Sequence, residues 1–326
     1  MDTKLVKITG ITLVIALIVI LVGLSAFNGM EANGHNLPQG VENVTRMQVT
    51  GILESNYQPS EVNCEAAFPT TPEKMIVYIV DRTISEKELI QIANNLGISD
   101  EVSKSPSGLI ITIGQGNNQI SSYKGTIDYS DSTSLPGYSP EYIDSHLPSD
   151  EEARKIADEF LDLYDLRPDG AVFYDTTHNV GHFVDPEKGV KIKNSESINV
   201  WYKHWINGYM ILTDKLRVEV DVHGQVRRMF MEWPHYEPYK EFPIIGPEKA
   251  YEYFKDTPIV IPDGMKNPEK ATVTKVSLVY IDHTMTEDLD YLIPCYYFQG
   301  VVHGDGKEAA FYQCIPATPE FAAEIT

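Results

Sequence analysis

The chain has 326 residues, enough for two ordinary domains, and its 26 basic and 47 acidic side chains give a formal charge of −21 at pH 7. This charge excludes a nucleic-acid-binding protein, because binding to phosphates requires clustered cations. Hydrophobic residues make up 42 %, so the chain can build a core, whereas three cysteines are too few for a disulfide-rich scaffold or a four-thiolate zinc site.

The first predicted element is a transmembrane helix at residues 8–27, which contain no charged side chain. Twenty residues rise about 30 Å as a helix, enough to cross the core of a bilayer. Lys4 and Lys7 precede it, so the positive-inside rule places a stub of residues 1–7 in the cytoplasm and the remainder outside. We therefore expect a single-pass protein of the cell membrane, with secretion after signal cleavage as the alternative.

Residues 28–72 are predicted to be a stalk, because they contain Gly, Asn, Pro and Ser without sustained periodicity. The sequence Asn43-Val44-Thr45 within them permits glycosylation on the outer side. Cys64 also lies in the stalk and has no evident partner.

Beyond the stalk the sequence predicts a repeated plan, a capped helix followed by amphipathic strands. In residues 73–146, a strand at 75–80 precedes a helix that Ser85 and Glu88 open as a capping box. Its apolar residues recur at helical spacing, and Gly97 ends it. Two further strands complete this small α+β unit.

Two more units follow, at residues 147–240 and 241–326. In the first, Ser149 and Glu152 cap a strongly amphipathic helix, and strands are expected at 198–212 and 216–233. In the second, Pro247 occupies the first position of a helix that precedes three strands. The recurring order predicts an α+β fold of repeated units, each one helix packed on an antiparallel sheet.

The last two strands suggest a disulfide bond. A hairpin that turns on Gly304-Asp305 would place Cys295 directly opposite Cys314. Directly opposed strand residues have Cα separations within the disulfide range, and disulfides persist outside the cytosol.

Strand and turn patterns carry a family resemblance. The residues Asn207-Gly208-Tyr209, the segment 217–226 and the helix at 149–161 resemble the PepSY-like (peptidase propeptide-type) modules of exported proteins. The resemblance implies a PepSY/cystatin-like helix on an antiparallel sheet. It also implies a non-catalytic module that binds or regulates an envelope or cell-surface protein, and it supplies no catalytic residues.

No established catalytic motif occurs in the sequence, and we predict neither an enzyme nor a cofactor. The nearest metal signal is His178 and His182, which lie four residues apart with Asp175 and Asp185 nearby. They define an alternative function, a metal-dependent hydrolase. The competing interpretation is an ordinary surface loop, which a glycine at position 181 favours over a helix.

Aromatic side chains provide the predicted binding surface. Trp201, Trp205, Tyr209 and Trp233 could grip a peptide, or could stack against sugars as a carbohydrate-binding module. The opposite interpretation places them in the core of a sheet, where aromatic residues are also favoured. Lys203 shares a strand face with Trp201 and Trp205, which favours a face in contact with water.

Overall fold

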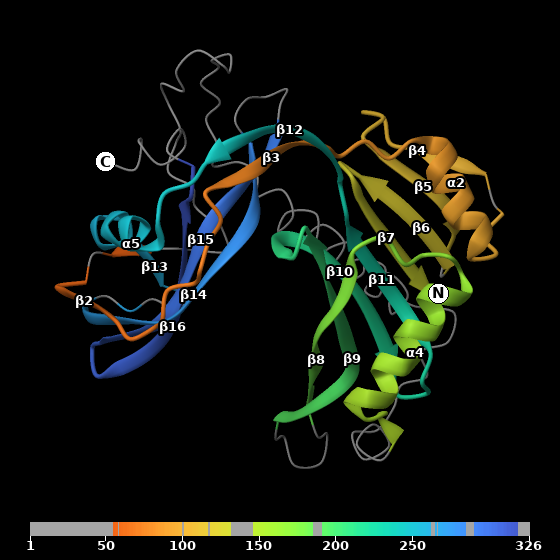
Figure 1. Ribbon diagram of the computed structural model, residues 1–326. Coiled ribbons are helices and arrows are strands. Elements are labelled where there is room, and N and C mark those ends of the chain that lie inside the picture. Colours follow the sequence, from red (N-terminus) through yellow and green to blue (C-terminus); the bar gives the residue numbers. More distant parts are fainter. Residues whose placement is uncertain are drawn as a thin grey trace. The chain divides into compact units, whose positions relative to one another are not determined.

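The structure is a computed structural model. It describes residues 55–57, 59–99, 101–116, 118–131, 146–184, 191–261, 265, 267–284 and 290–318. These residues form sixteen strands and three helices (Figure 1). They divide into two compact units. Unit 2 contains Tyr78–Pro238 and Tyr280–Asp282, and unit 1 contains the described residues before Tyr78, Tyr239–Val279 and the described residues from His283 onward.

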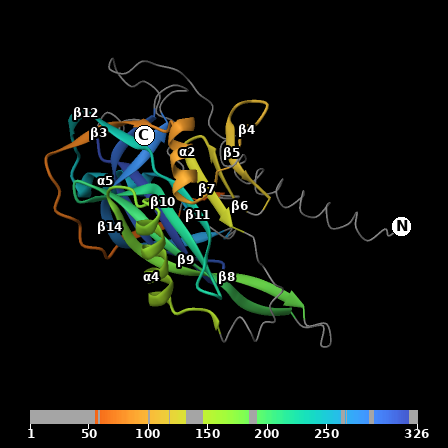
Figure 2. The same ribbon diagram turned by 90° about the vertical axis from the view of Figure 1, so that its right-hand side faces the viewer.

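Unit 2 is built on eight strands of a larger sheet, each antiparallel to its neighbours among the eight, and one parallel pair, Ile211 with Tyr280, joins β10 to β14 (Pro268–Thr284). In spatial order the strands are β4 (Val102–Lys104), β5 (Ile110–Gln115), β6 (Asn118–Tyr123), β7 (Thr126–Asp131), β11 (Val226–Glu232), β10 (Tyr209–Asp221), β9 (Lys191–Ile206) and β8 (Ala171–Val184). Figure 2 shows β8 and β9 continuing together as a two-stranded ribbon.

Two helices cover one face of this sheet. Helix α2 (Glu86–Asn95) packs on β5 and β6, and α4 (Asp150–Leu163) packs on β9, β10 and β11 (Figure 1). Both predicted N-caps are confirmed. Ser85 accepts a hydrogen bond from the backbone of Glu88, and Ser149 and Glu152 form a complete capping box.

The alternation of side chains along each strand separates a core from an opposite face. Val200 and Tyr202 of β9 and Val218 of β10 are fully buried beneath the helices. Their neighbours Trp201 and Arg217 point to the other side and are only partly buried. Trp201 and Tyr202 therefore lie on opposite faces of the sheet.

Unit 1 contains the other sheet strands and one helix. Strands β12 (His235–Pro243), β3 (Lys74–Asp81), β15 (Asp290–Gly304) and β14 (Pro268–Thr284) lie in that order, with β16 (Lys307–Pro316) on β15 and β2 (Glu61–Cys64) parallel to β14. A separate pair joins β1 (Ser55–Tyr57) to β13 (Ile259–Ile261). Helix α5 (Pro247–Asp256) begins at the predicted proline and packs on β16.

The predicted fold of repeated helix-on-sheet units is wrong. Three helices accompany a predominantly β structure whose sheets are mixed, because β2 and β14 run parallel. Neighbours in the sheet also come from distant parts of the sequence, as where β7 pairs with β11. The helical signals were correct locally, but local periodicity does not determine which strands pair.

The membrane span expected from the sequence is not among the helices that the structure describes. Across those ranges, none of the helices combines the length and the apolar character that crossing a bilayer requires. Residues 8–27 and the sequon at Asn43 lie outside the described residues. Part of the predicted stalk, Glu61–Cys64, forms β2.

The predicted disulfide bond between Cys295 and Cys314 is also wrong, and all three cysteines are free. The hairpin turns on Asp305-Gly306, not on Gly304-Asp305, because both central residues of this tight turn adopt positive φ and Asp-Gly suits that geometry. The register consequently moves by two residues, so that Cys295 faces Pro316 and Cys314 faces Tyr297.

Burial makes the two hairpin thiols unreactive. It raises the pKa of Cys314 to about 12 and that of Cys295 well above its usual value, so both stay protonated at neutral pH. We expect neither thiol of the native protein to react with Ellman's reagent at pH 8, and all three to react after unfolding in guanidinium without reductant. A total of one thiol after unfolding would instead demonstrate a disulfide bond.

Candidate functional site

The first candidate site is the face of the unit 2 sheet opposite α2 and α4, which we call the open face. The strand register places Trp201, Arg217, Phe230 and Asp128 side by side across β9, β10, β11 and β7. A second row beside them contains Asn199, Glu219, Arg228 and Ser130. The open face thus gathers aromatic rings and charges of both signs.

Cations on the open face lie against its aromatic rings. The Arg217 guanidinium is 5.8 Å from the centroid of the Trp201 ring, and Lys215 Nζ is 5.6 Å from that of Phe230. The Nε of Arg217 is buried and has no hydrogen-bond partner among the described residues. A buried donor without an acceptor is unfavourable, so a movement of the Arg217 side chain that brings this N–H to an acceptor is favoured.

Charges surround Asp128 in the middle of the same row. Desolvation by its surroundings raises the pKa of Asp128, and the nearby Glu219 carboxylate adds to the rise. Arg228 and Arg217 act in the opposite direction by favouring the anion. Asp128 is exposed, so its carboxylate stays in contact with water, in the field of both guanidinium groups.

A hydrogen-bonded ladder fixes one margin of the open face. Asn179 donates to Ser197 Oγ at 2.9 Å, Asn199 donates to Asn179 Oδ1 at 2.8 Å, and Ser197 donates to Glu219 at 2.7 Å. Trp201 Nε1 donates to Thr177 Oγ1 at 2.8 Å. These bonds hold the Trp201 indole in one orientation without covering the row beside it.

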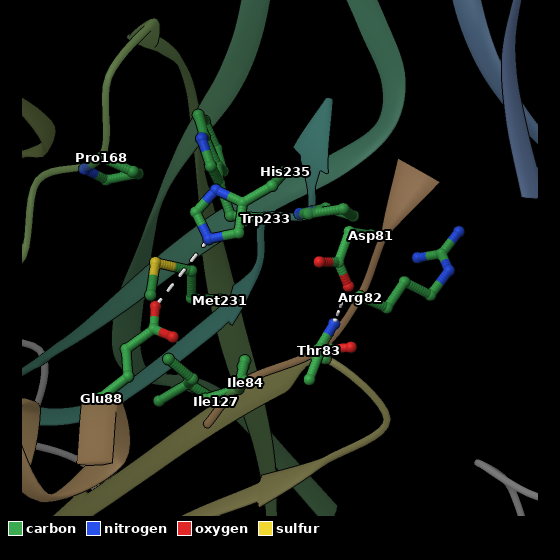
Figure 3. A pocket seen from close by; sticks show the side chains of 12 residues that line it. Asp81, Arg82, Thr83, Ile84, Glu88, Ile127, Pro168, Met231, Trp233 and His235 are labelled. Atoms are coloured by element: carbon green, nitrogen blue, oxygen red, sulfur yellow. Dashed lines mark hydrogen bonds and ion pairs between the residues drawn. The ribbon is translucent and has the colours of Figure 1, made fainter. Parts of the chain in front are cut away.

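The second candidate site is a pocket of about 110 Å³ on the helical side of unit 2 (Figure 3). Its apolar lining comes from Ile84, Ile127, Pro168, Met231, Trp233 and Pro234. Its polar lining comes from Asp81, Arg82, Thr83, Glu88 and His235, with Gly125 between them. The N-terminal turn of α2 thus meets the ends of β3 and β11 around this cavity.

A buried polar cluster of His204, Asp214 and Tyr236 packs against the Trp233 ring. The His204 ring stacks on the Trp233 ring at 4.5 Å and 12° between planes. The carboxylate of Asp214, which is 1 % exposed, makes hydrogen bonds with His204 Nδ1 at 2.8 Å and with the Tyr236 hydroxyl at 2.6 Å. Burial raises the pKa of Asp214, while both hydrogen bonds oppose the rise.

A bulge in β10 brings Asp214 to this place. Ile211 and Leu216 of β10 pair with His204 and Tyr202, so five steps on β10 correspond to two on β9. Lys203 Nζ stabilises the extra backbone by donating to the carbonyl oxygens of Leu212 at 2.8 Å and Asp214 at 3.1 Å. Asp214 carries no signal in the sequence, because nothing in the pattern of residues distinguishes a bulge from a turn.

The four aromatic residues predicted as a binding surface lie in different environments. Trp201 belongs to the open face, whereas Trp233 packs against the core cluster on the helical side and lines the pocket. Trp205, near the end of β9, is 42 % exposed. Tyr209 packs edge-on against Tyr280 at 6.3 Å. Trp201 and Trp233 therefore do not share one surface.

Of the alternative metal site, Asp185 and the side chain of His182 lie outside the part of the chain that the structure describes. His178 Nε2 makes a hydrogen bond with Asp150 Oδ1 at 2.9 Å. Residues 178 and 182 both lie in β8, where four steps separate Cα atoms by about 13 Å. Within the ranges that the structure describes, no three His, Cys, Asp or Glu side chains are grouped to hold a metal ion.

Comparisons with known proteins do not show a family for this chain. No family model matches the sequence, and no curated protein matches it. Among solved structures, the chain is similar to an uncharacterized protein from Eubacterium rectale ATCC 33656. The two are 13 % identical, with a TM-score of 0.46 over 80 % of this chain and 90 % of that one.

Proposed function

We propose that the protein is a non-catalytic binding or regulatory protein that holds an envelope protein partner on the open face of unit 2, outside the cytoplasm. The observation that carries the proposal is Arg217, whose guanidinium lies over Trp201 while its buried Nε lacks an acceptor. A partner that brings a carbonyl or carboxylate oxygen to this N–H satisfies it.

The composition of the open face supports binding to a protein. Arg and Trp are the residues that most often dominate the binding energy of protein interfaces. Trp201 presents a rigid ring that loses little entropy on binding, because Thr177 already fixes it. The charges of Arg228, Asp128 and Glu219 would give the contact its specificity more than its strength.

Crosslinking of envelope proteins to the protein tests this proposal. We expect Arg217→Ala to reduce recovery of the crosslinked partner at least tenfold, since loss of a central interface arginine commonly costs about 2 kcal/mol or more. Trp201→Ala should have a similar effect. Recovery is quantified by mass spectrometry with circular dichroism as the check of folding.

Arg154→Ala provides the matched control. Arg154 also lies over an aromatic ring, that of Phe173 at 4.1 Å, but it belongs to α4 on the helical side. The control should recover the partner as well as the unmodified protein. Equal losses in the Arg217 and Arg154 variants, or the absence of any envelope partner, would overturn the proposal.

A further inference from the structure

We propose that the pocket of unit 2 binds the side chain of one basic residue, lysine or arginine, presented by a polypeptide. The inference rests on the proposed function only in taking a protein as the source of that residue. The pocket lies on the helical side of unit 2, so its ligand can be tested separately from the open face.

The size of the cavity favours one side chain over a small-molecule ligand. Its volume of about 110 Å³ is far below the 300–1,000 Å³ of ordinary ligand pockets. Ile84, Ile127 and Met231 supply an apolar wall that could contact the methylene groups of a long side chain. Both Lys and Arg carry such a stem beneath the charge.

The polar lining favours a positive charge at the end of that stem. Hydrogen bonds from Thr83 lower the pKa of Asp81, which keeps this carboxylate ionised. Glu88 Oε1 lies 4.0 Å from His235 Nε2, at the outer limit of an ion pair and beyond hydrogen-bonding distance, so its oxygens can still accept hydrogen bonds from a bound cation (Figure 3). Two carboxylates thus border a cavity in a protein whose formal charge is −21.

The one arginine in the lining does not cancel this charge within the cavity. Arg82 forms an ion pair with Asp282 and lies 4.0 Å from Glu232, neither of which lines the pocket. In Figure 3 its side chain points away from Glu88. The acidic partners of Arg82 therefore neutralise it, and Asp81 and Glu88 dominate the field at the opening.

The aromatic wall is already in position for a cation. Trp233 stacks on His204, and Asp214 in turn fixes His204 through its Nδ1. The Trp233 Nε1 donates to the carbonyl of Asp169 at 3.3 Å, which holds the other edge of the ring. A wall that needs no rearrangement loses no entropy when a cation docks against it.

Titration with blocked amino acids tests the inference. The ligands are N-acetyl-lysine and N-acetyl-arginine methylamides, and their uncharged analogues norleucine and citrulline serve as controls. The double variant Trp201→Phe/Trp205→Phe retains Trp233 alone of the three tryptophans. We expect at least one basic amide to change Trp233 fluorescence with a Kd of about 1 mM, and its neutral analogue to bind at least tenfold more weakly.

Two substitutions of glutamate by glutamine at neighbouring sites distinguish binding in the pocket from attraction by the overall negative charge of the protein. Glu88→Gln should weaken binding of the basic amide about tenfold. Glu86→Gln changes the same charge in the same turn of α2, but Glu86 pairs with Lys104 outside the pocket, so binding should change less than twofold.

Three results would overturn the inference: equal binding of charged and neutral amides, equal losses in the two glutamine variants, or no fluorescence change up to 50 times the expected Kd, about 50 mM. None of them alters the recovery of a partner through Arg217. Conversely, failure to recover an envelope partner through Arg217 would leave binding of the basic amides unchanged.

Discussion

Replacing Asp214 with alanine is expected to lower the free energy of unfolding of unit 2 by about 3–5 kcal/mol. The carboxylate is 1 % exposed and joins His204 to Tyr236. Its removal leaves the His204 Nδ1 and the Tyr236 hydroxyl without an acceptor inside the protein. It also releases the support of Trp233, which stacks on His204.

Tryptophan fluorescence during urea unfolding measures this effect, because Trp201, Trp205 and Trp233 all belong to unit 2. Asp214→Asn keeps one acceptor oxygen and should lose less stability than Asp214→Ala. Glu237→Ala removes an exposed carboxylate from the next strand and should change stability by less than about 0.5 kcal/mol. An Asp214→Ala variant as stable as Glu237→Ala would show that the cluster contributes nothing to folding.

Replacing Phe254 with alanine is expected to destabilise unit 1 by about 3–5 kcal/mol. Phe254 of α5 is 0 % exposed, and its ring stacks on Phe298 at 4.7 Å and on Phe311 at 5.9 Å. Truncation opens a cavity between the helix and the closing hairpin. The cost includes the lost transfer free energy of the ring and the contacts that the cavity removes.

Hydrogen exchange of β15 and β16, followed by mass spectrometry, measures the loss in unit 1 directly. Phe254→Leu fills most of the space and should retain more protection than Phe254→Ala. Phe242→Ala, at a half-buried position of the same unit, is the control and should cost less. Undiminished protection of both strands in Phe254→Ala would contradict a core centred on this ring.

Helices were the predictable part of the fold, because their signals are local. Ser85, Ser149 and Pro247 stand at the start of the three helices as expected. A capping residue acts within four positions of itself, so one sequence suffices to recognise it. No such local signal identifies β7 as the neighbour of β11, about 100 residues later in the chain.

An error in the predicted position of a hairpin turn also displaces the strand that follows it. The sequence analysis ended a strand at residue 212, whereas the chain turns at Asn207-Gly208 and continues through the bulge as β10. Asn-Gly is a strong signal for a hairpin turn, but in the prediction it counted only toward the PepSY-like resemblance. With the turn displaced, Asp214 was assigned to a loop and its burial could not be foreseen.

The candidate sites were partly visible in the sequence. Alternation along β9 is visible in the sequence, and Trp201 and Tyr202 face opposite ways in the structure. The neighbours of Trp201 on the open face, Arg217 and Asp128, depend on the register of three strand pairs. Periodicity within one strand carries no information on that register.

The path of the chain through the two units has a consequence for synthesis. Unit 2 is almost complete when Pro238 has been made, whereas unit 1 waits for β15 and β16 near the end of the chain. A domain whose segments are made early can fold first, while one that depends on the last segments cannot. The single late contribution to unit 2 is Tyr280–Asp282, where Tyr280 pairs with Ile211. A ribosome that stops before β14 would therefore release a nearly finished unit 2. Its open face would be formed, and only the place of Tyr280–Asp282 would be unfilled.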